Sequence, residues 1–449
     1  MSGAPTIVGS RRVLEPTQKS SHAAMTHDVS WARAPRRTDR AGRFDAIFVP
    51  ASRGAGALDA AARLSARLEA PLVALCSLDA RAAEVATRLT RISGCRALVV
   101  NVPRGYRHAL LPRRTAAPRF QVAAANRRSD LSLKRNLGLL LARLHGWGKI
   151  LFLDDDITDR VHGFPISLPT VTARRLAAEL DSRQIAGLTC RDFPDNSVVC
   201  HARRLAGFRQ DTFVSGSALG VNCNDQPIPF FPSQYNEDWF FFSSLAAERN
   251  LGFAGSAIQA PYDPYADPNR AREEEFGDLL AEGLYTLFEQ QRAEMKYSRR
   301  LDEADETYWE KFIEARRNMI GLTALSLEVA VEYAHDVDRC AAALRSLDAA
   351  QQQLSRLSPG ICADFVDAWA SDLLDWQHAT QRLSSAGRTE NALAALGLND
   401  WYLVGEQGRT RRHPRVRPAA PSGVPARACH RPTTSSSPAR VPAPRRNPG

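Results

Sequence analysis

The sequence predicts an α/β fold with a mostly parallel sheet flanked by helices and followed by a helical extension. Two observations carry this prediction. Short apolar runs alternate with amphipathic helical segments between residues 44 and 189, which is the pattern of β-α-β units. In addition, residues 150–153 form a bounded apolar run that leads directly into three aspartates. Such a run is typical of a strand that is buried on both faces of a parallel sheet.

The composition fits a globular chain with a large core. The chain has 449 residues, of which 44% are hydrophobic, enough for one large domain with additions. No apolar run approaches the roughly 18 to 20 residues that a membrane span needs, and no signal-type apolar block precedes Trp31. The eight cysteines form no Cys-x-x-Cys pair, so we expect reduced thiols rather than a zinc site or disulfides. These features predict a cytoplasmic protein, with peripheral membrane contact left open.

The net charge of +10 comes from the two ends of the chain. Residues 409–449 hold ten arginines and no acid, and residues 1–40 have a net charge of +4. Residues 41–408 are left with a net charge of −4, which does not indicate a core that binds nucleic acid. Both ends lack hydrophobic periodicity and predict disorder. The arginine-rich tail is either a solvated segment or a contact for nucleic acid or anionic lipid.

The first predicted strand, residues 44–50, is closed by Pro50. A glycine-containing loop with Ser52 and Arg53 follows it and leads into a helix. The backbone N–H groups of such a strand-to-helix junction favour an anion. The loop matches neither the Walker motif nor the dinucleotide fingerprint, so a plain tight turn is the alternative. Further helices are predicted over residues 58–68, 80–89 and 131–144, and further strands over residues 72–75, 97–102 and 150–153.

Three polar residues near these elements are candidates for contact with a nucleotide. Asp79 lies just past the second strand, where it hydrogen-bonds a ribose or base, or else caps the next helix. Arg135 and Asn136 lie early in the helix over residues 131–144, mainly off its stripe of leucines. They either reach the nucleotide beside Asp154, Asp155 and Asp156 at the edge of the sheet or belong to a solvated helix face.

Asp154, Asp155 and Asp156 follow the strand that ends at residue 153. Because an unpaired carboxylate is costly to bury, we expect the acids at the carboxyl edge of the sheet, where α/β folds bind ligands. Carboxylate oxygens suit Mg²⁺ or Mn²⁺, which commonly hold substrate phosphates. Strand alternation puts Asp154 and Asp156 on the same side. The motif therefore predicts a divalent-metal site for a nucleotide diphosphate, and the alternative is a solvated acidic turn.

Two further segments carry candidate residues. Ser215, Gly216 and Ser217 either let a ligand approach the backbone closely or belong to a β-bulge or turn. Glu237 and Asp238 precede an aromatic run. They either favour a helix start through the helix dipole or supply a general base, since apolar surroundings raise the proton affinity of a carboxylate. A helix is predicted over residues 171–180, a strand over residues 185–189 and another strand over residues 198–201.

Residues 270–400 differ in sequence pattern from the preceding part. Charged amphipathic helices predominate there, over residues 272–297, 307–332, 338–357 and 362–383. We therefore expect four parts: a disordered tail over residues 1–40, an α/β domain over residues 41–268, a helical extension over residues 269–404 and a disordered tail over residues 405–449.

Four blocks in this order resemble the GT-A nucleotide-sugar glycosyltransferases, particularly the large family-two group, over roughly residues 44–262. The separation between the second block and the aspartates also fits that family. The blocks are Val49-Pro50-Ala51-Ser52-Arg53, then Lys134-Arg135-Asn136-Leu137-Gly138 with Leu151-Phe152-Leu153-Asp154-Asp155-Asp156, then Ser215-Gly216-Ser217-Ala218, and finally Asn236-Glu237-Asp238-Trp239.

The resemblance implies a GT-A type, Rossmann-like domain that moves a sugar from a nucleotide-diphosphate donor to a hydroxyl acceptor, with inversion. Asp156, with Asp154 nearby, would bind Mn²⁺ or Mg²⁺. Asp238 would deprotonate the acceptor, with Glu237 as the competing candidate. The donor would lie on Pro50, Ser52, Arg53, Asp79, Arg135, Asn136, Asp154, Asp155, Ser215, Gly216 and Ser217.

Two departures from the family pattern affect the metal and the acceptor. Family members often place a metal-binding histidine after the base block, where this chain has Gln259-Ala260-Pro261-Tyr262-Asp263. Either Asp263 substitutes or the third ligand is absent. The segment with Gly216 is also smaller and more polar than the common form.

Two other functions compete with this interpretation. A nucleotidyltransferase on a similar sheet would use the loop Arg53-Gly54-Ala55-Gly56. A non-catalytic glycosyltransferase-like binding protein would use the helical region and the arginine-rich tail as interaction surfaces.

Overall fold

The structure of the chain is a computed structural model. It describes residues 42–157, 168–191, 193, 196–208, 213–224, 227–291, 295–331, 336–405 and 410–412. The tail predicted over residues 1–40, and residues 413–449 of the second tail, lie outside the described residues.

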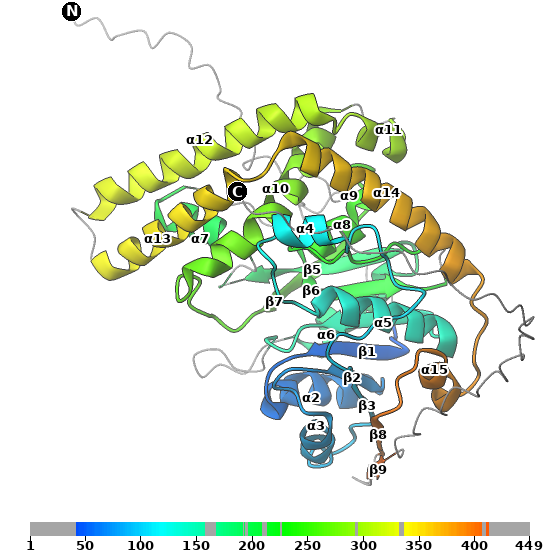
Figure 1. Ribbon diagram of the computed structural model, residues 1–449. Coiled ribbons are helices and arrows are strands. Elements are labelled where there is room, and N and C mark those ends of the chain that lie inside the picture. Colours follow the sequence, from blue (N-terminus) through cyan, green and yellow to red (C-terminus); the bar gives the residue numbers. More distant parts are fainter. Residues whose placement is uncertain are drawn as a thin grey trace, which may run out of the picture. The chain divides into compact units, whose positions relative to one another are not determined.

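A mixed sheet organises the described residues (Figure 1). Its nine strands lie in the order β7-β5-β6-β4-β1-β2-β3-β8-β9. Strands β6 and β8 run opposite to the other seven, so the predicted α/β class and the mostly parallel sheet are confirmed. The strands are β1 (Ala46–Ala51), β2 (Leu72–Cys76), β3 (Ala97–Asn101), β4 (Lys149–Leu153), β5 (Ile185–Arg191), β6 (Val214–Asn222), β7 (Gly252–Ile258), β8 (Trp401–Val404) and β9 (Thr410–Arg412).

Helices flank this sheet and continue beyond it. None of the described helices combines the length and the apolar character that crossing a membrane requires. The helices are η2 (Ala55–Leu58), α2 (Asp59–Leu68), α3 (Ala82–Leu89), α4 (Pro118–Ala123), α5 (Leu131–His145), α6 (Thr170–Glu179), α7 (Val198–Leu205), α8 (Glu237–Phe241), α9 (Ser243–Ala247), α10 (Pro268–Gln290), α11 (Tyr297–Asp302), α12 (Glu306–Val331), α13 (Val337–Leu354), α14 (Pro359–Gln381) and α15 (Thr389–Ala395).

Strand β1 buries its two faces in different parts of the core. Phe48 belongs to the hydrophobic cluster that includes α5 and the C-terminal helices, whereas Ile47 and Val49 belong to the cluster with α2, α3 and α6. Successive side chains of a strand point to opposite faces. A strand covered on both sides therefore needs a continuous apolar run, which is what the sequence supplies.

Pro50 lies inside β1 and does not close it, contrary to the prediction. The pairing of β1 with β4 ends at Phe48, whereas its pairing with β2 continues to Ala51. The backbone N–H of Ile47 bonds on the β2 side, so by alternation position 50 faces the β4 side. Proline lacks an N–H, and at this position the ladder with β4 no longer needs one.

The strand predicted over residues 198–201 is wrong, because these residues begin helix α7. The Ser197 hydroxyl accepts a hydrogen bond from the backbone N–H of Cys200 at 3.2 Å and caps the helix. A short apolar run does not distinguish a strand from a buried helix. Periodicity alone therefore missed the serine cap that decides the matter.

The segment with Gly216 is a strand, not an isolated turn. It forms β6, which pairs antiparallel with β4 on one side and with β5 on the other. The irregularity lies in β5, where the pairing register shifts between Gly187 and Leu188. A central position in the sheet therefore fixes the backbone of this segment.

The C-terminal helices α10, α12, α13 and α14 share the hydrophobic cluster that covers one face of the sheet. Helices α12 and α13 lie side by side (Figure 1). The single helix expected over residues 272–297 is replaced by α10 and α11. After α15 the chain returns to the sheet, where β8 pairs with β3 and β9 pairs with β8. Neither of these strands is among the elements that the sequence predicts.

Candidate functional site

The strand order reverses at β1, which makes the space beyond β1 and β4 the place to look for a site. Strands β2 and β3 lie on one side of β1, and β4 lies on the other. Open α/β sheets bind ligands beyond the carboxyl ends of the strands at such a reversal. Arg53 follows β1 there, and the three aspartates follow β4.

Asp155 fastens the loop after β1 to the end of β4. Its Oδ2 accepts hydrogen bonds from the backbone N–H groups of Ser52 at 2.8 Å and Arg53 at 3.0 Å. Its other oxygen, Oδ1, pairs with the Arg53 guanidinium. The Asp155 side chain is buried. This carboxylate holds the loop in place, and these hydrogen bonds leave it little room to contact a donor.

Arg135 is the hub of the site. Its Nη2 donates to both carboxylate oxygens of Asp154, at 2.8 and 3.0 Å, and to the backbone carbonyl of Gly216 at 2.9 Å. Its Nη1 donates to Oε1 of Glu237 at 2.6 Å. The guanidinium also lies 5.5 Å from the centre of the Phe231 ring. One side chain of α5 thus joins the ends of β4 and β6 to the start of α8.

The charge of Arg135 is secured by its neighbours. Burial on its own lowers the pKa of this guanidinium, but Asp154, Glu237 and Asp238 outweigh that effect and raise the pKa above its ordinary value. A buried cation with fixed partners positions carboxylates well. The alternative of a solvated helix face is wrong, because Lys134, Arg135 and Asn136 are all buried.

Gly216 allows Asp238 and Arg135 to approach the backbone of β6. The Gly216 N–H donates to Oδ2 of Asp238 at 2.6 Å. A Cβ at this position would lie 2.6 Å from the Asp238 Cβ and 2.8 Å from Nη1 of Arg135. The close approach expected for a ligand is therefore made by the protein's own side chains.

Ser215 and Ser217 are buried within the sheet. Their hydroxyls bond to each other at 3.0 Å, and the Ser217 hydroxyl lies 3.1 Å from the Cys190 thiol. The Ser217 carbonyl accepts the backbone N–H of Asp154 at 2.8 Å. These contacts stiffen the strand next to Asp154, and the predicted contact of these residues with a donor stays a prediction.

Glu237 and Asp238 differ in accessibility although they are adjacent at the start of α8. Glu237 is buried and paired with Arg135, whereas Asp238 is half-buried. Oδ1 of Asp238 accepts the backbone N–H of Trp239 at 3.0 Å. A proton acceptor must be reachable by its substrate, so the geometry favours Asp238 over Glu237.

Asp156 faces a residue that the sequence analysis did not place in the site. Its Oδ2 accepts from Nε2 of Gln259 at 2.9 Å and from Nη2 of Arg53 at 3.1 Å. Its backbone carbonyl accepts the N–H of Ala260 at 2.9 Å. Gln259 follows β7 and is buried, and its Oε1 has no hydrogen-bond partner among the described residues. Its position after β7, where the family that the sequence resembles often has a histidine, is the sequence signal that could have found it.

The predicted metal ligands fit a divalent cation unequally. Both oxygens of Asp154 lie within 3.0 Å of a buried guanidinium nitrogen, so a second cation there is disfavoured by repulsion. The cation beside Asp156 is Arg53, whose side chain is 55% exposed and can turn away. The carboxylate of Asp156 and the side-chain carbonyl of Gln259 offer the hard oxygens that such ions prefer. The fit therefore favours Asp156 with Gln259 rather than the predicted pair with Asp154.

Two neighbours in α5 have scaffolding roles. Asn136 exchanges hydrogen bonds with the backbone of Phe231, both at 2.8 Å, so it does not point to the acidic edge as predicted. Lys134 is fully buried and donates to the Ala51 carbonyl and the Ser52 hydroxyl, both at 2.7 Å. Burial lowers the pKa of Lys134. Both residues hold segments that shape the site.

Asp79 lies beside the loop after β1 by backbone pairing. Its N–H donates to the Ser52 carbonyl at 3.1 Å. Its side chain is exposed, and its carboxylate has no hydrogen-bond partner among the described residues. Helix α3 begins at Ala82 with Arg81 as its N-cap, so Asp79 does not cap it. This position leaves Asp79 available to a ligand.

Comparison with known proteins does not assign the chain. No protein-family model matches the sequence, and no curated protein matches it. Any functional conclusion therefore rests on the residues and the geometry described above.

Proposed function

We propose that the chain is a metal-dependent glycosyltransferase of GT-A type, which moves a sugar from a nucleotide-diphosphate donor to a hydroxyl acceptor. One observation carries the proposal. Arg135 and Gly216 link the aspartates after β4 to the carboxylates of α8 through direct hydrogen bonds, at the sheet position where α/β folds bind nucleotides. Residues that are some eighty positions apart in sequence thus belong to one site.

The charge balance supports a cation in the bound state. Five carboxylates and three cationic side chains make up the site among the described residues, so an anionic diphosphate would meet a net negative surface. A Mn²⁺ or Mg²⁺ ion would neutralise that negative charge and would stabilise charge on the leaving diphosphate. Asp156 and Gln259 would hold it. The charged groups are Asp154, Asp155, Asp156, Glu237 and Asp238 against Arg53, Lys134 and Arg135.

Side chains of the protein itself have separate roles around the acceptor. Asp238 accepts the proton of the attacking hydroxyl as its oxygen approaches the anomeric carbon, and the expected outcome is inversion. The N–H groups of Gly216 and Trp239 orient this carboxylate. Arg135 keeps Asp154 and Glu237 in place beside Asp238, and the exposed guanidinium of Arg53 would meet the donor phosphates.

The test is a turnover assay with a panel of sugar nucleotides in the presence of Mn²⁺. We expect release of the nucleoside diphosphate, and we expect Asp156→Asn and Asp238→Asn each to lower the rate by about a hundredfold or more without lowering the melting temperature appreciably. The exposed Asp367→Asn on α14 is the matched control. A variant at Asp156 or Asp238 with near-normal turnover would remove that residue from the mechanism.

A nucleotidyltransferase is the second candidate, and the glycine-containing loop favours it. The positions of Gly54 and Gly56 open into free space, and Arg53 beside them is exposed. Release of pyrophosphate, instead of a nucleoside diphosphate, in the same assay would select this function.

A further inference from the structure

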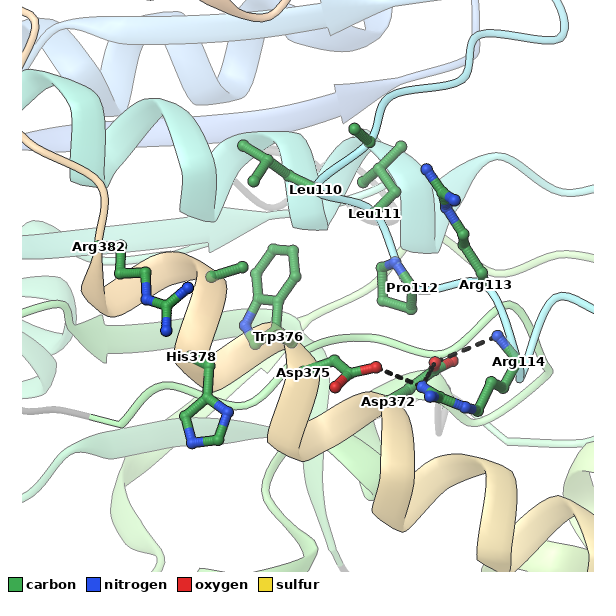
Figure 2. Close-up of a pocket in the computed structure, with 12 residues that line it drawn as sticks. Leu110, Leu111, Pro112, Arg113, Arg114, Asp372, Asp375, Trp376, His378 and Arg382 are labelled. Atoms are coloured by element: carbon green, nitrogen blue, oxygen red, sulfur yellow. Dashed lines mark hydrogen bonds and ion pairs between the residues drawn. The ribbon is translucent and has the colours of Figure 1, made fainter.

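A pocket lies between the loop over residues 109–114 and the end of α14 (Figure 2). Its volume is about 610 Å³, which is within the usual size of small-molecule sites. The loop belongs to the connection between β3 and α4, and α14 belongs to the C-terminal helices. The two walls therefore come from segments that lie far apart in the sequence.

Asp372 fixes the two walls to each other. Its carboxylate accepts the backbone N–H groups of Arg114 at 3.1 Å and Thr115 at 2.8 Å, together with the Thr115 hydroxyl at 2.9 Å. The Arg114 guanidinium pairs with Asp372 at 3.3 Å and with Asp375. The two acids of the lining are thus engaged in holding the loop to the helix, so the pocket is formed before any ligand arrives.

The remaining charged groups of the lining are positive. Arg113 and Arg382 have no ion-pair partner among the residues that the structure describes, and His378 is the third basic group. All three side chains are exposed. Because residues 41–408 have a net charge of −4, the two arginines without an ion-pair partner run against the overall charge. A guanidinium matches the geometry of a phosphate or a carboxylate.

The indole of Trp376 adds a hydrogen-bond donor that lacks an acceptor. Trp376 is 2% exposed, and its Nε1 has no hydrogen-bond partner among the described residues. In Figure 2 this nitrogen lies on the side of the ring that faces Arg382 and His378. Buried polar groups normally find a partner, so an acceptor from a ligand would satisfy a donor that the protein leaves unmet.

The opposite wall is apolar. Leu110, Leu111 and Pro112 face the space across from Trp376 (Figure 2). We propose that the pocket binds an organic anion, with its phosphate or carboxylate group at Arg382 and the Trp376 N–H, and its apolar body against this wall. Basic residues at a helix end also complement the helix dipole. That effect accounts for His378 and Arg382, but it explains neither Arg113 nor the unmet indole.

Calorimetric titration of the full chain tests the proposal with three matched probes: phenyl phosphate, benzoate and uncharged benzyl alcohol. We expect at least one of the two anions to bind with a dissociation constant below about 10 mM, and benzyl alcohol to bind at least about tenfold more weakly. The stronger anion identifies the head group, phosphate or carboxylate. Absence of binding by both anions, or equal binding of benzyl alcohol, overturns the proposal.

Variants locate the binding within the pocket. Arg382→Gln should weaken binding of the preferred anion about tenfold. Trp376→Phe keeps a ring and removes the N–H, and it should weaken this binding about threefold. The exposed Arg356→Gln at the end of α13 is the control and should leave the affinity unchanged. If Trp376→Phe unfolds, Arg382→Gln and Arg113→Gln decide alone. Unchanged affinity in both of these variants places any binding elsewhere and overturns the proposal.

Discussion

Two buried arginines hold carboxylates together in this molecule, and they do so in different surroundings. Arg135 lies at the edge of the sheet and binds Asp154 and Glu237. Arg316 lies on α12 within the C-terminal helices, where one guanidinium serves three acids. Its partners are Glu275 at 2.7 and 3.0 Å, Asp278 at 2.6 Å and Glu282 at 2.6 Å.

The difference between the two clusters is their access to solvent. Every side chain that bonds to Arg316 is at most 5% exposed. Around Arg135, Asp154 is 18% exposed and the neighbouring Asp156 is 13% exposed. The same combination of residues is therefore enclosed in one place and reachable in the other. Burial, rather than residue type, separates an ion-pair cluster that holds the fold from one that can meet a ligand.

The largest expected effect is the loss of Arg316. Arg316→Met leaves three buried acids without their cation, and a broken buried pair costs about 3 to 5 kcal/mol. Denaturant unfolding should show this loss of free energy of unfolding. The next residue provides the control, since Arg317 is 41% exposed and pairs with the exposed Glu314. Arg317→Gln should change stability by less than about 1 kcal/mol. Equal effects of the two variants would contradict the enclosed character of the Arg316 cluster.

Gly216→Ala should give the next largest effect, at the other arginine. The new methyl group would overlap the side chains of Asp238 and Arg135, and such overpacking costs about 1 to 3 kcal/mol. Turnover should fall as well, because Asp238 is displaced. Gly321 is an exposed position of α12, and a methyl group added there would meet open space. Gly321→Ala should therefore stabilise the protein by up to about 1 kcal/mol. If Gly216→Ala changed neither the free energy of unfolding nor turnover, the close contact at this position would not be needed for stability or activity.

The Arg316 cluster should make stability depend on pH. Burial raises the pKa of Glu275 to about 7 against the lowering effect of Arg316, and burial and Asp278 also raise the pKa of Glu282. Near neutral pH the folded state therefore holds protons that the unfolded state has released, so stability should fall as the pH rises through 7. Each group contributes at most about 1.4 kcal/mol per pH unit.

The pH window is chosen to exclude an opposing group. Burial lowers the pKa of His201 to about 4, which makes stability rise with pH up to the ordinary histidine value of about 6.5. Melting temperatures should therefore be compared above that pH. Glu282→Gln should flatten the decline, and the exposed Glu310→Gln should not. A slope that Glu282→Gln leaves unaltered would assign the titration to other groups.

The smallest stability effect is expected at Arg53, the exposed cation of the acidic edge. Arg53→Gln should change the free energy of unfolding by less than about 1 kcal/mol, since its pairs are partly solvated. Removing this positive charge from Asp156 should, however, increase the rise in melting temperature that Mn²⁺ causes. If Mn²⁺ shifts the melting temperature of neither protein, the acidic edge does not bind this ion.

The candidate site was predictable in part, for identifiable reasons. The acids after β4 were found because a buried apolar strand must end where carboxylates begin, since an unpaired carboxylate is costly to bury. The scaffolding roles of Asn136, Ser215 and Ser217 were not found, because the local sequence shows neither the bond of Asn136 to the distant backbone of Phe231 nor the burial of both serine hydroxyls within the sheet. Gln259 was missed although its position after β7 was a signal, because its contact with Asp156 joins residues 103 positions apart and forms only in the folded chain.

Local pattern by itself determined strands β1 to β5, helices α2, α3, α5 and α6 and the acidic strand end, because side-chain periodicity and the cost of burying charge act over a few residues. Tertiary structure decided which charged residues are enclosed and which are reachable. It gave Gly216 its neighbours and brought β8 back to the sheet. These outcomes depend on contacts between distant segments, which no short stretch of sequence contains.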